Sequence, residues 1–295
     1  MVGKIGVMAD SSADLPVGFA KKKQINLVPN SIFINKQGPK LHGVDIENKE
    51  VLEYLRQKDD VTTEAVVPPR FCLMFQTLLK KYEYLYSFNV SDDLSKCYEN
   101  AQYGLNLYKQ ISLDGDTENK IKLIDTRAVG ISFGIIVNRI ATIVNVKQDM
   151  EIARLDKYIA WLVKNLHMYF VVDDLYWLKR SGKLNMISGF LGQLLDFKPV
   201  IKLEKGMLLP VEKCRGKNIA VDGMIKFIKE AASKYKRGFE IWVGHSAAIL
   251  DAKYAVKQLA ASLKIDKKKI LLVDIGPTMA AHIGPGGVCV TMLPR

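Results

Sequence analysis

The sequence predicts an α/β fold with two domains: an N-terminal Rossmann-like parallel sheet and a C-terminal α/β domain with a mixed or antiparallel sheet. The 295 residues are 48% hydrophobic and 25% charged, which is long enough for about two domains and apolar enough to bury a core. In the first half, short apolar runs alternate with helical patterns, as in parallel strands joined by helices. In the second half, apolar runs flank Glu204-Lys205-Gly206 and indicate a hairpin. We therefore assign residues 1–160 to the first domain and residues 161–295 to the second.

The elements expected in the first half are apolar strands that end in turn-forming residues and helices with one apolar face. Pro68-Pro69 marks a helix start, because proline suits the first helical turn. The expected strands cover residues 4–9, 26–34, 84–90 and 121–125, and residues 40–46 complete a small hairpin. The expected helices cover residues 50–57, 68–80 and 130–144, with one more that begins near Ser95 and ends at Gln110.

The second half is expected to open with a helix over about residues 150–166. Its expected strands are residues 168–173, 198–203, 207–211, 240–244, 270–275 and 288–293. Its other expected helices are one that ends near residue 236 and one over residues 248–263. Two segments are expected to be loops, namely a basic turn at residues 178–183 and a Gly- and Pro-rich loop at residues 276–287.

Several classes of protein are disfavoured by the sequence. No apolar stretch follows Met1, so we expect no secretory signal. The longest apolar run, residues 128–146, is interrupted by Asn138, Arg139 and Asn145, which disfavours a membrane span. The four cysteines form no CxxC pair, which argues against a zinc site or a disulfide scaffold. We expect a cytoplasmic protein without a metal or other cofactor.

Positive charge is concentrated in the second half. Residues 1–150 hold 19 Lys+Arg and 18 Asp+Glu, whereas residues 151–295 hold the other 24 and 13. Such a balance favours an anionic partner, either nucleic acid, a membrane surface or a phosphate or carboxylate ligand. The alternative is that surface lysines only keep the protein soluble. We expect no nucleic-acid partner, because no nucleic-acid-binding motif is present; transient membrane contact is compatible with the charge.

Hydroxyl side chains stand at three places where an expected strand, helix or turn begins or ends. Ser11 and Ser12 follow the first strand, Ser95 stands where a helix begins, and Thr63 precedes a Pro-Pro turn. The carboxyl ends of strands in an open parallel sheet face the ligand crevice, and free N–H groups at a helix start attract anions. These hydroxyls therefore form a candidate carboxylate site, with ordinary helix capping as the alternative.

Two basic segments and one histidine are further candidates. Arg180 and Arg215 belong to basic segments of the second half, and an arginine can bind phosphate or carboxylate through two parallel hydrogen bonds. The alternative is a pair of solvated loops. His282 lies in the Gly- and Pro-rich segment and is a candidate donor to an anionic head group, or else a structural loop histidine.

A serine hydrolase is the alternative function. Gly244-His245-Ser246-Ala247-Ala248 follows a strand and is similar to a nucleophile elbow, with Asp274 and His282 later in the chain. However, Ala248 stands where the closing glycine is expected, and little chain remains to build the rest of such a fold. No other nucleophile, general base or metal set is evident, which favours a binding protein over an enzyme.

Four motifs, taken in order, resemble the DegV family of bacterial fatty-acid-binding proteins nearly end to end. They are Asp10-Ser11-Ser12-Ala13-Asp14-Leu15-Pro16; Leu94-Ser95 with Tyr98 and Ala101; Leu178-Lys179-Arg180-Ser181-Gly182-Lys183; and Ile275-Gly276-Pro277 with Ala281-His282-Ile283-Gly284-Pro285-Gly286. The chain departs from the family in three places. Only Thr63 and Pro68 remain of a Thr-Ser-Gln-Pro-Ser-Pro stretch, Lys96-Cys97 replaces Gly-Thr after the serine, and Lys217 stands at a second basic position.

The resemblance implies a carrier of one long-chain fatty acid rather than an enzyme. The acyl chain would lie in a buried apolar tunnel, where each buried CH₂ contributes about 0.8 kcal/mol. Thr63, Ser95 and His282 would hold the carboxylate, because a buried carboxylate needs several hydrogen bonds. Arg180 and Arg215 would serve phosphate handling or the docking of a separate fatty acid kinase.

Overall fold

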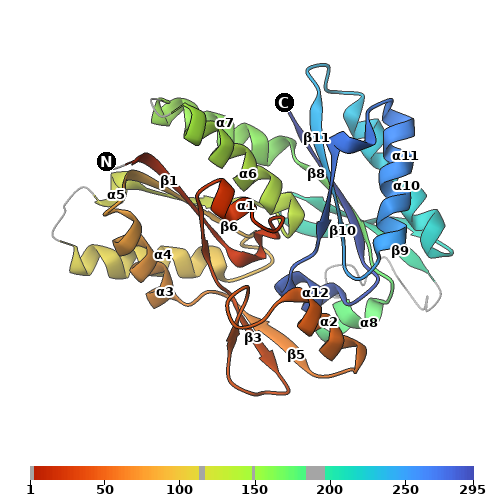
Figure 1. The fold of residues 1–295 in the computed structure, drawn as a ribbon, viewed down its shortest axis with the longest axis horizontal. Coiled ribbons are helices and arrows are strands. Elements are labelled where there is room, and N and C mark those ends of the chain that lie inside the picture. The colour runs from red at the N-terminus through yellow and green to blue at the C-terminus, as the bar shows by residue number, and fades with distance from the viewer. Residues whose placement is uncertain (1–2, 113–116, 148–149, 184–196) are drawn as a thin grey trace.

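The computed structural model describes residues 3–112, 117–147, 150–183 and 197–295, and these form three β-sheets (Figure 1). The first sheet is entirely parallel, with the strand order β2-β1-β6-β7. Its strands are β1 (Gly3–Asp10), β2 (Ile25–Val28), β6 (Tyr82–Asn89) and β7 (Ile121–Asp125). The Rossmann-like parallel sheet predicted for the N-terminal half is therefore confirmed.

Helices cover both faces of the first sheet, because each parallel crossover needs a connection long enough to return the chain. α3 (Pro68–Leu78) and α4 (Cys97–Ile111) pack on each other and on one face. α6 (Ile131–Val146) packs on β1 and β2 from the other side and also contacts the second sheet. The shorter elements nearby are η1 (Ser11–Ala13), α1 (Phe19–Lys22) and α5 (Thr117–Lys120).

The second sheet is mixed, as predicted, with the order β10-β9-β8-β13-β11-β12. Only β11 and β12 pair in parallel; the other pairs are antiparallel, including the β9–β10 hairpin. Its strands are β8 (His167–Val171), β9 (Lys198–Glu204), β10 (Met207–Cys214), β11 (Phe239–His245), β12 (Ile270–Asp274) and β13 (Val288–Pro294).

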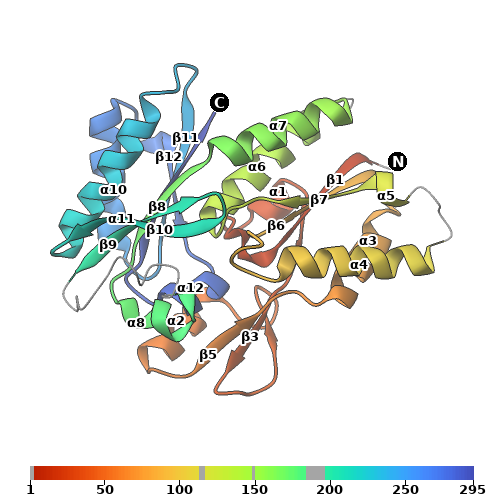
Figure 2. The ribbon, with the colours of Figure 1, turned by 180° about the vertical axis from the view of Figure 1, so that it is seen from behind.

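The two faces of the second sheet bury different cores, because successive side chains of a strand point to opposite faces. Met168 and Phe170 of β8 belong to the core shared with the first sheet. Tyr169 and Val171 belong to a separate core under α10 (Lys217–Ala232) and α11 (Ile249–Leu263). Figures 1 and 2 both place α10 and α11 at one end of the molecule and α3 and α4 at the other. The inner face of the second sheet is thus turned toward the first sheet.

A small third sheet was predicted only in part: the hairpin that residues 40–46 complete was expected, but the strand over residues 61–64 was not. β3 (Ser31–Ile34) pairs antiparallel with β4 (Lys40–Leu41) and β5 (Val61–Glu64), and α2 (Asn48–Arg56) packs beside them. The single strand predicted over residues 26–34 is therefore wrong. Pro29 lies between β2 and β3 and has no N–H to donate, so the ladder stops there and the chain passes from one sheet to another.

Two segments predicted as loops are helical. The predicted basic turn overlaps α8 (Leu175–Arg180), whose start is capped by the Asp174 side chain. The Gly- and Pro-rich segment contains α12 (Pro277–Ile283), which begins at a proline and ends before Gly284 at φ 69°. Both signals, proline at a helix start and glycine after its end, were present in the sequence. His282 consequently lies on a helix.

The two halves of the chain are joined by α7 (Ile152–Asn165), which leads from the side of the first sheet into β8. The predicted boundary between residues 160 and 161 falls within this helix and stays a prediction. Arg139 of α6 bonds Glu240 of β11 at 2.7 Å and ties the halves together. Across the described residues, we find no helix that is both long and apolar enough to span a membrane.

Candidate functional site

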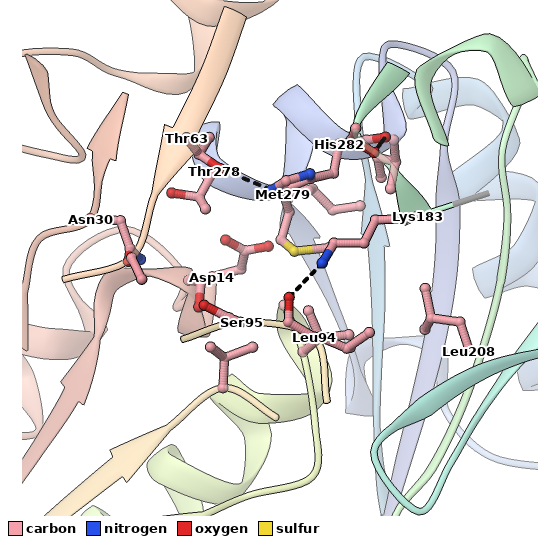
Figure 3. A pocket seen from close by; sticks show the side chains of 18 of the residues that line it. Asp14, Asn30, Thr63, Leu94, Ser95, Lys183, Leu208, Thr278, Met279 and His282 are labelled. Atoms are coloured by element: carbon pink, nitrogen blue, oxygen red, sulfur yellow. Dashed lines mark hydrogen bonds between the residues drawn. The ribbon is translucent and has the colours of Figure 1, made fainter. Parts of the chain in front are cut away.

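A cavity of about 630 Å³ lies where the three sheets meet (Figure 3). Ser12, Val90 and Val129 line it just beyond β1, β6 and β7, so it opens at the carboxyl ends of the parallel strands. The predicted position of a ligand crevice is thus occupied by a cavity. The volume falls within the range of small-molecule sites, about 300–1,000 Å³.

The polar end of the cavity brings together Thr63 of β5 and His282 of α12. Thr63 Oγ1 and His282 Nε2 are 2.9 Å apart, although the two residues are 219 positions apart in sequence. Burial lowers the pKa of His282 to about 4, so the ring is neutral at pH 7. His282 Nδ1 is buried without a hydrogen-bond partner among the described residues. A bound oxygen or water is the natural partner for such an atom.

Ser95 lines the same cavity just before α4. The Cys97 N–H donates to Ser95 Oγ at 3.3 Å, so the serine accepts the first N–H of the helix from the position before its N-cap, Lys96, and still has its own proton to donate. The helix start predicted here is confirmed, and capping does not remove the hydroxyl from the cavity. The neighbouring Lys96 pairs with Glu99 at 2.7 Å on the surface, with its side chain 76% exposed.

Lys183 is a half-buried cation in the cavity lining, which also includes the exposed Lys96. Lys183 Nζ donates to the Leu94 carbonyl oxygen at 2.6 Å, next to Ser95, as Figure 3 shows. Burial lowers the pKa of Lys183. The bond joins the segment after α8 to the segment before α4, so Lys183 spans the space between the two halves beside the predicted carboxylate site.

Part of the cavity lining, here named the apolar wall, consists of apolar side chains. Leu208 of β10, Phe170 of β8 and Cys289 of β13 come from the inner face of the second sheet, and Met279 and Ile283 come from α12. Leu208 and Phe170 are 7% and 5% exposed, so the wall is shielded from solvent. An apolar chain in contact with this wall would be removed from water.

The polar side chains at the end of β1 and in the loop after it form hydrogen bonds within the protein. Ser11 Oγ accepts from the Asn30 N–H at 2.9 Å, and Ser12 Oγ donates to Asp10. Asp10 also accepts from the Val90 N–H at 2.9 Å. Burial raises the pKa of Asp10, although these bonds oppose the effect. Both hydroxyls thus form hydrogen bonds within the protein, and the role of Ser11 and Ser12 as anion ligands stays a prediction.

The two predicted arginines lie outside the cavity lining. Arg180 donates to the carbonyl oxygens of Asp59 and Val61 at 3.0 Å each and pairs with Asp60 at 2.9 Å, so it holds the start of β5. Arg215 is exposed and lies 5.2 Å from the centre of the Phe197 ring. Their predicted roles in phosphate handling and kinase docking stay predictions.

The alternative hydrolase triad does not assemble. Asp274 pairs with His245 at 3.4 Å, whereas His282 bonds Thr63. Ser246 is fully buried, and its Oγ has no hydrogen-bond partner among the described residues. A serine nucleophile needs a base within hydrogen-bond reach, so this arrangement does not support the predicted serine hydrolase.

Four residues line the cavity although the sequence analysis gave them no individual role in ligand binding: Asp14, Asn30, Lys183 and Thr278. Asn30 follows Pro29, and Thr278 follows the proline that opens α12, so each stands beside a signal that marks an element end. Lys183 was treated only as part of a basic turn. In the part of the chain that is described, no group of three or more His, Cys, Asp or Glu could hold a metal ion.

Comparison of the sequence with family models gives a match to the family described as "Uncharacterised protein, DegV family" over residues 4–295. A DegV domain-containing protein of Caldanaerobacter subterraneus subsp. tengcongensis is 25% identical over 287 residues, which cover 96% of each chain. One from Staphylococcus aureus is 22% identical over 289 residues, with 98% of each chain covered.

Solved structures share the fold along the whole chain. A structure from Thermus thermophilus, described as fatty acid binding of a DegV family protein, has a TM-score of 0.87 and 21% identity over 99% of this chain and 100% of that one. A fatty acid binding protein from Bacillus subtilis has a TM-score of 0.84 and 20% identity, with 99% of each chain covered. A stearic acid-binding protein from Eubacterium ventriosum has a TM-score of 0.85 and 19% identity over 100% and 98% of the two chains.

Proposed function

The chain belongs to the DegV family, and from that premise we propose that it binds one long-chain fatty acid in the cavity between its sheets. The observation that carries this proposal is the shape and chemistry of the cavity. It has about 630 Å³ of space, and its lining combines polar groups, among them Thr63, Ser95 and His282, with apolar side chains that include the inner face of the second sheet. The solved relatives described as fatty-acid-binding proteins support the same ligand class.

In this proposal, Thr63, Ser95 and His282 hold the carboxylate. The Ser95 hydroxyl has a proton to donate. The bond between Thr63 and the neutral His282 ring uses only one of the pair's two hydrogens, so the other remains as a second donor. Hydrogen bonds to a charged group each contribute about 1.5–3 kcal/mol. Lys183, which lines the same cavity, adds a positive charge beside the head group.

We also propose that the protein presents this carboxylate to a separate fatty acid kinase. Lys183 and the exposed Arg215 would favour the acyl phosphate product, because it carries more negative charge than the carboxylate. The concentration of cations in the second half would speed association with an acidic partner surface. The cytoplasmic location and transient membrane contact expected from the sequence remain predictions.

Native mass spectrometry of the purified full-length protein tests the ligand. We expect one bound fatty acid per chain, identified by lipid extraction, and restored binding when a long-chain fatty acid is added to the delipidated protein. A co-purified nucleotide, or no saturable uptake of any long-chain fatty acid, would contradict the proposal. Decanoate and a long-chain alcohol serve as matched ligands that lack, respectively, the chain length and the carboxylate.

A further inference from the structure

Asp14 is a buried carboxyl group that the proposed head-group site does not yet use. It lines the cavity, is 5% exposed, and neither of its carboxyl oxygens has a hydrogen-bond partner among the described residues. Asp10, four positions earlier and also fully buried, accepts bonds from the side chains or backbone of Ser12, Asn30 and Val90. The same loop thus holds one satisfied carboxyl group and one without partners.

The surroundings of Asp14 are built to admit its side chain. A Cβ atom at Gly130 would lie 3.2 Å from Oδ2, and a Cβ atom at Gly276 would clash with Oδ1. These glycines come from the start of α6 and from the residue before α12, so both halves of the chain leave room for the carboxyl group. Figure 3 shows the group in the middle of the view, between the side chains of Asn30 and Met279.

No cation neutralises Asp14, as no salt bridge to it is found among the described residues. The titratable groups that face it are Asp10, His42 and Cys289. His42 lies beside Gly276, and burial lowers its pKa to about 4, so it is neutral at pH 7. Burial raises the pKa of the Cys289 thiol. Lys183, on the same cavity, already donates to the Leu94 carbonyl.

Burial therefore raises the pKa of Asp14 well above its ordinary value. The Gly276 backbone lies close to the carboxyl group and lowers its pKa in part, although the two form no hydrogen bond of normal geometry. The negative charge of Asp10 raises the pKa of Asp14 further. A protonated carboxyl group has an O–H to donate, and the cavity that Asp14 lines has room for the oxygen that would accept it.

We propose that Asp14 faces the cavity as a protonated carboxylic acid and donates a hydrogen bond to an oxygen of the ligand head group. This inference rests on the proposed binding of a fatty acid. Neutral Asp14 would bind a carboxylate through a charge-assisted hydrogen bond, whereas ionised Asp14 would repel the same ligand. Asp14 would thus be a specificity-determining residue that couples the affinity for a carboxylate to its own protonation.

The test compares wild-type protein with Asp14→Asn and Asp14→Ala, each as the full-length delipidated chain. Asparagine is neutral at every pH and its amide still donates, so Asp14→Asn should bind oleate within about threefold of wild type at pH 6–7. Alanine should weaken binding about tenfold, since one hydrogen bond to a charged group is lost. As pH rises, wild-type affinity should fall relative to Asp14→Asn, and this ratio cancels the titration of the ligand itself.

Asp92→Asn makes the same chemical change at an exposed position and is the matched control, which should keep the wild-type pH profile. A constant ratio of wild-type to Asp14→Asn affinity across pH 6–10 would overturn the proposal. Oleamide has a head group that does not ionise, so its binding should depend much less on pH in the wild type.

Infrared spectroscopy gives a second measurement, and the only variant that it requires in folded form is Asp14→Asn. We expect a protonated carboxylic acid C=O band in ligand-free wild type that shifts when oleate binds and is missing from Asp14→Asn. Absence of the band, or a band that oleate does not move, would overturn the proposal. If neither protein binds any fatty acid, the proposed function fails, while the band still decides the protonation of Asp14.

Discussion

The polar end of the cavity and its apolar wall are built in different ways. The polar groups come from four separate segments: Asp14 after η1, Thr63 on β5, Ser95 before α4 and His282 on α12. The wall is mainly one face of one sheet, where Phe170 and Cys289 are directly paired across β8 and β13. Binding to the wall depends on apolar area, which many side chains can supply, whereas binding at the polar end depends on the direction of a few hydrogen bonds.

Because of this difference, we expect the two parts of the cavity to tolerate different kinds of substitution. The wall should accept apolar residues of similar volume with little loss, since such swaps cost less than about 1.5 kcal/mol. The polar end should not accept loss of a single donor, because each donor is fixed by its own segment and has no neighbour to replace it. The experiments below separate the two regions, beginning with the largest effect.

A charge placed in the wall should have the largest effect. Leu208→Lys would put an ammonium group where the acyl chain lies, so we expect long-chain fatty acid affinity to fall at least about hundredfold. Leu209→Lys is the matched control, because the next residue of the strand points to the other face. Leu208→Met should bind within about threefold of wild type. Calorimetric titration measures all three, and normal binding by Leu208→Lys would place the acyl chain elsewhere.

Loss of a donor at the polar end should have the next largest effect. Ser95→Ala and Thr63→Val should each weaken binding of a long-chain fatty acid by about ten- to hundredfold. Binding of the corresponding alcohol should change much less, because it brings no charge to these donors. Unchanged fatty acid affinity in both variants, with an intact circular dichroism spectrum, would show that these residues do not hold the carboxylate.

Acid should act on the polar end through His282. Its pKa is lowered by burial to about 4, so below its ordinary value of 6.5 the unfolded state binds a proton that the folded state does not. Above pH 6.5 the ring is neutral in both states, so the free energy of unfolding does not depend on this group. As the pH falls from 6.5 to 5, protonation of the unfolded state lowers the free energy of unfolding by about 2 kcal/mol, and the loss continues toward pH 4. His282→Gln should flatten this part of the stability profile in urea unfolding, while His42 and His167 keep the rest. An unchanged slope would mean that His282 is charged in the folded protein.

The basic residues should affect phosphorylation more than fatty acid binding. We expect Arg180→Ala and Arg215→Ala to keep fatty acid binding near normal and to lower phosphorylation by a cognate fatty acid kinase about tenfold. Arg180 is the most informative, because its bonds hold β5 two residues before Thr63. If its loss abolishes fatty acid binding while the loaded protein is phosphorylated normally, Arg180 supports the head-group site instead.

The smallest effect is expected at Ser246. Because its hydroxyl contacts neither Asp274 nor His282, Ser246→Ala should leave any p-nitrophenyl ester hydrolysis unchanged. A robust hydrolysis that disappears in this variant would restore the hydrolase reading. Fatty acid binding should also be unchanged, since Ser246 does not line the cavity.

Local patterns in the sequence predicted the regular elements well. The strand expected over residues 121–125 has the bounds of β7, and the hairpin expected around Lys205 is formed by β9 and β10. These elements are marked by short-range signals, namely apolar periodicity and turn residues. Of the third sheet, the β3–β4 hairpin was expected, whereas β5 was missed because it pairs with β3 across a chain separation that no local pattern encodes.

The α/β class, the order of most elements and the presence of hydroxyl and imidazole groups suited to a carboxylate follow from the sequence. Which of these groups lie close together depends on the tertiary fold. Thr63 and His282 lie 2.9 Å apart across 219 positions, whereas Ser11 and Ser12, equally promising in sequence, are used within the protein. Asp10 and Asp14 share one loop, yet only Asp10 has donors. Element type depends on neighbours along the chain, but the partners and burial of a polar group depend on segments that arrive from elsewhere.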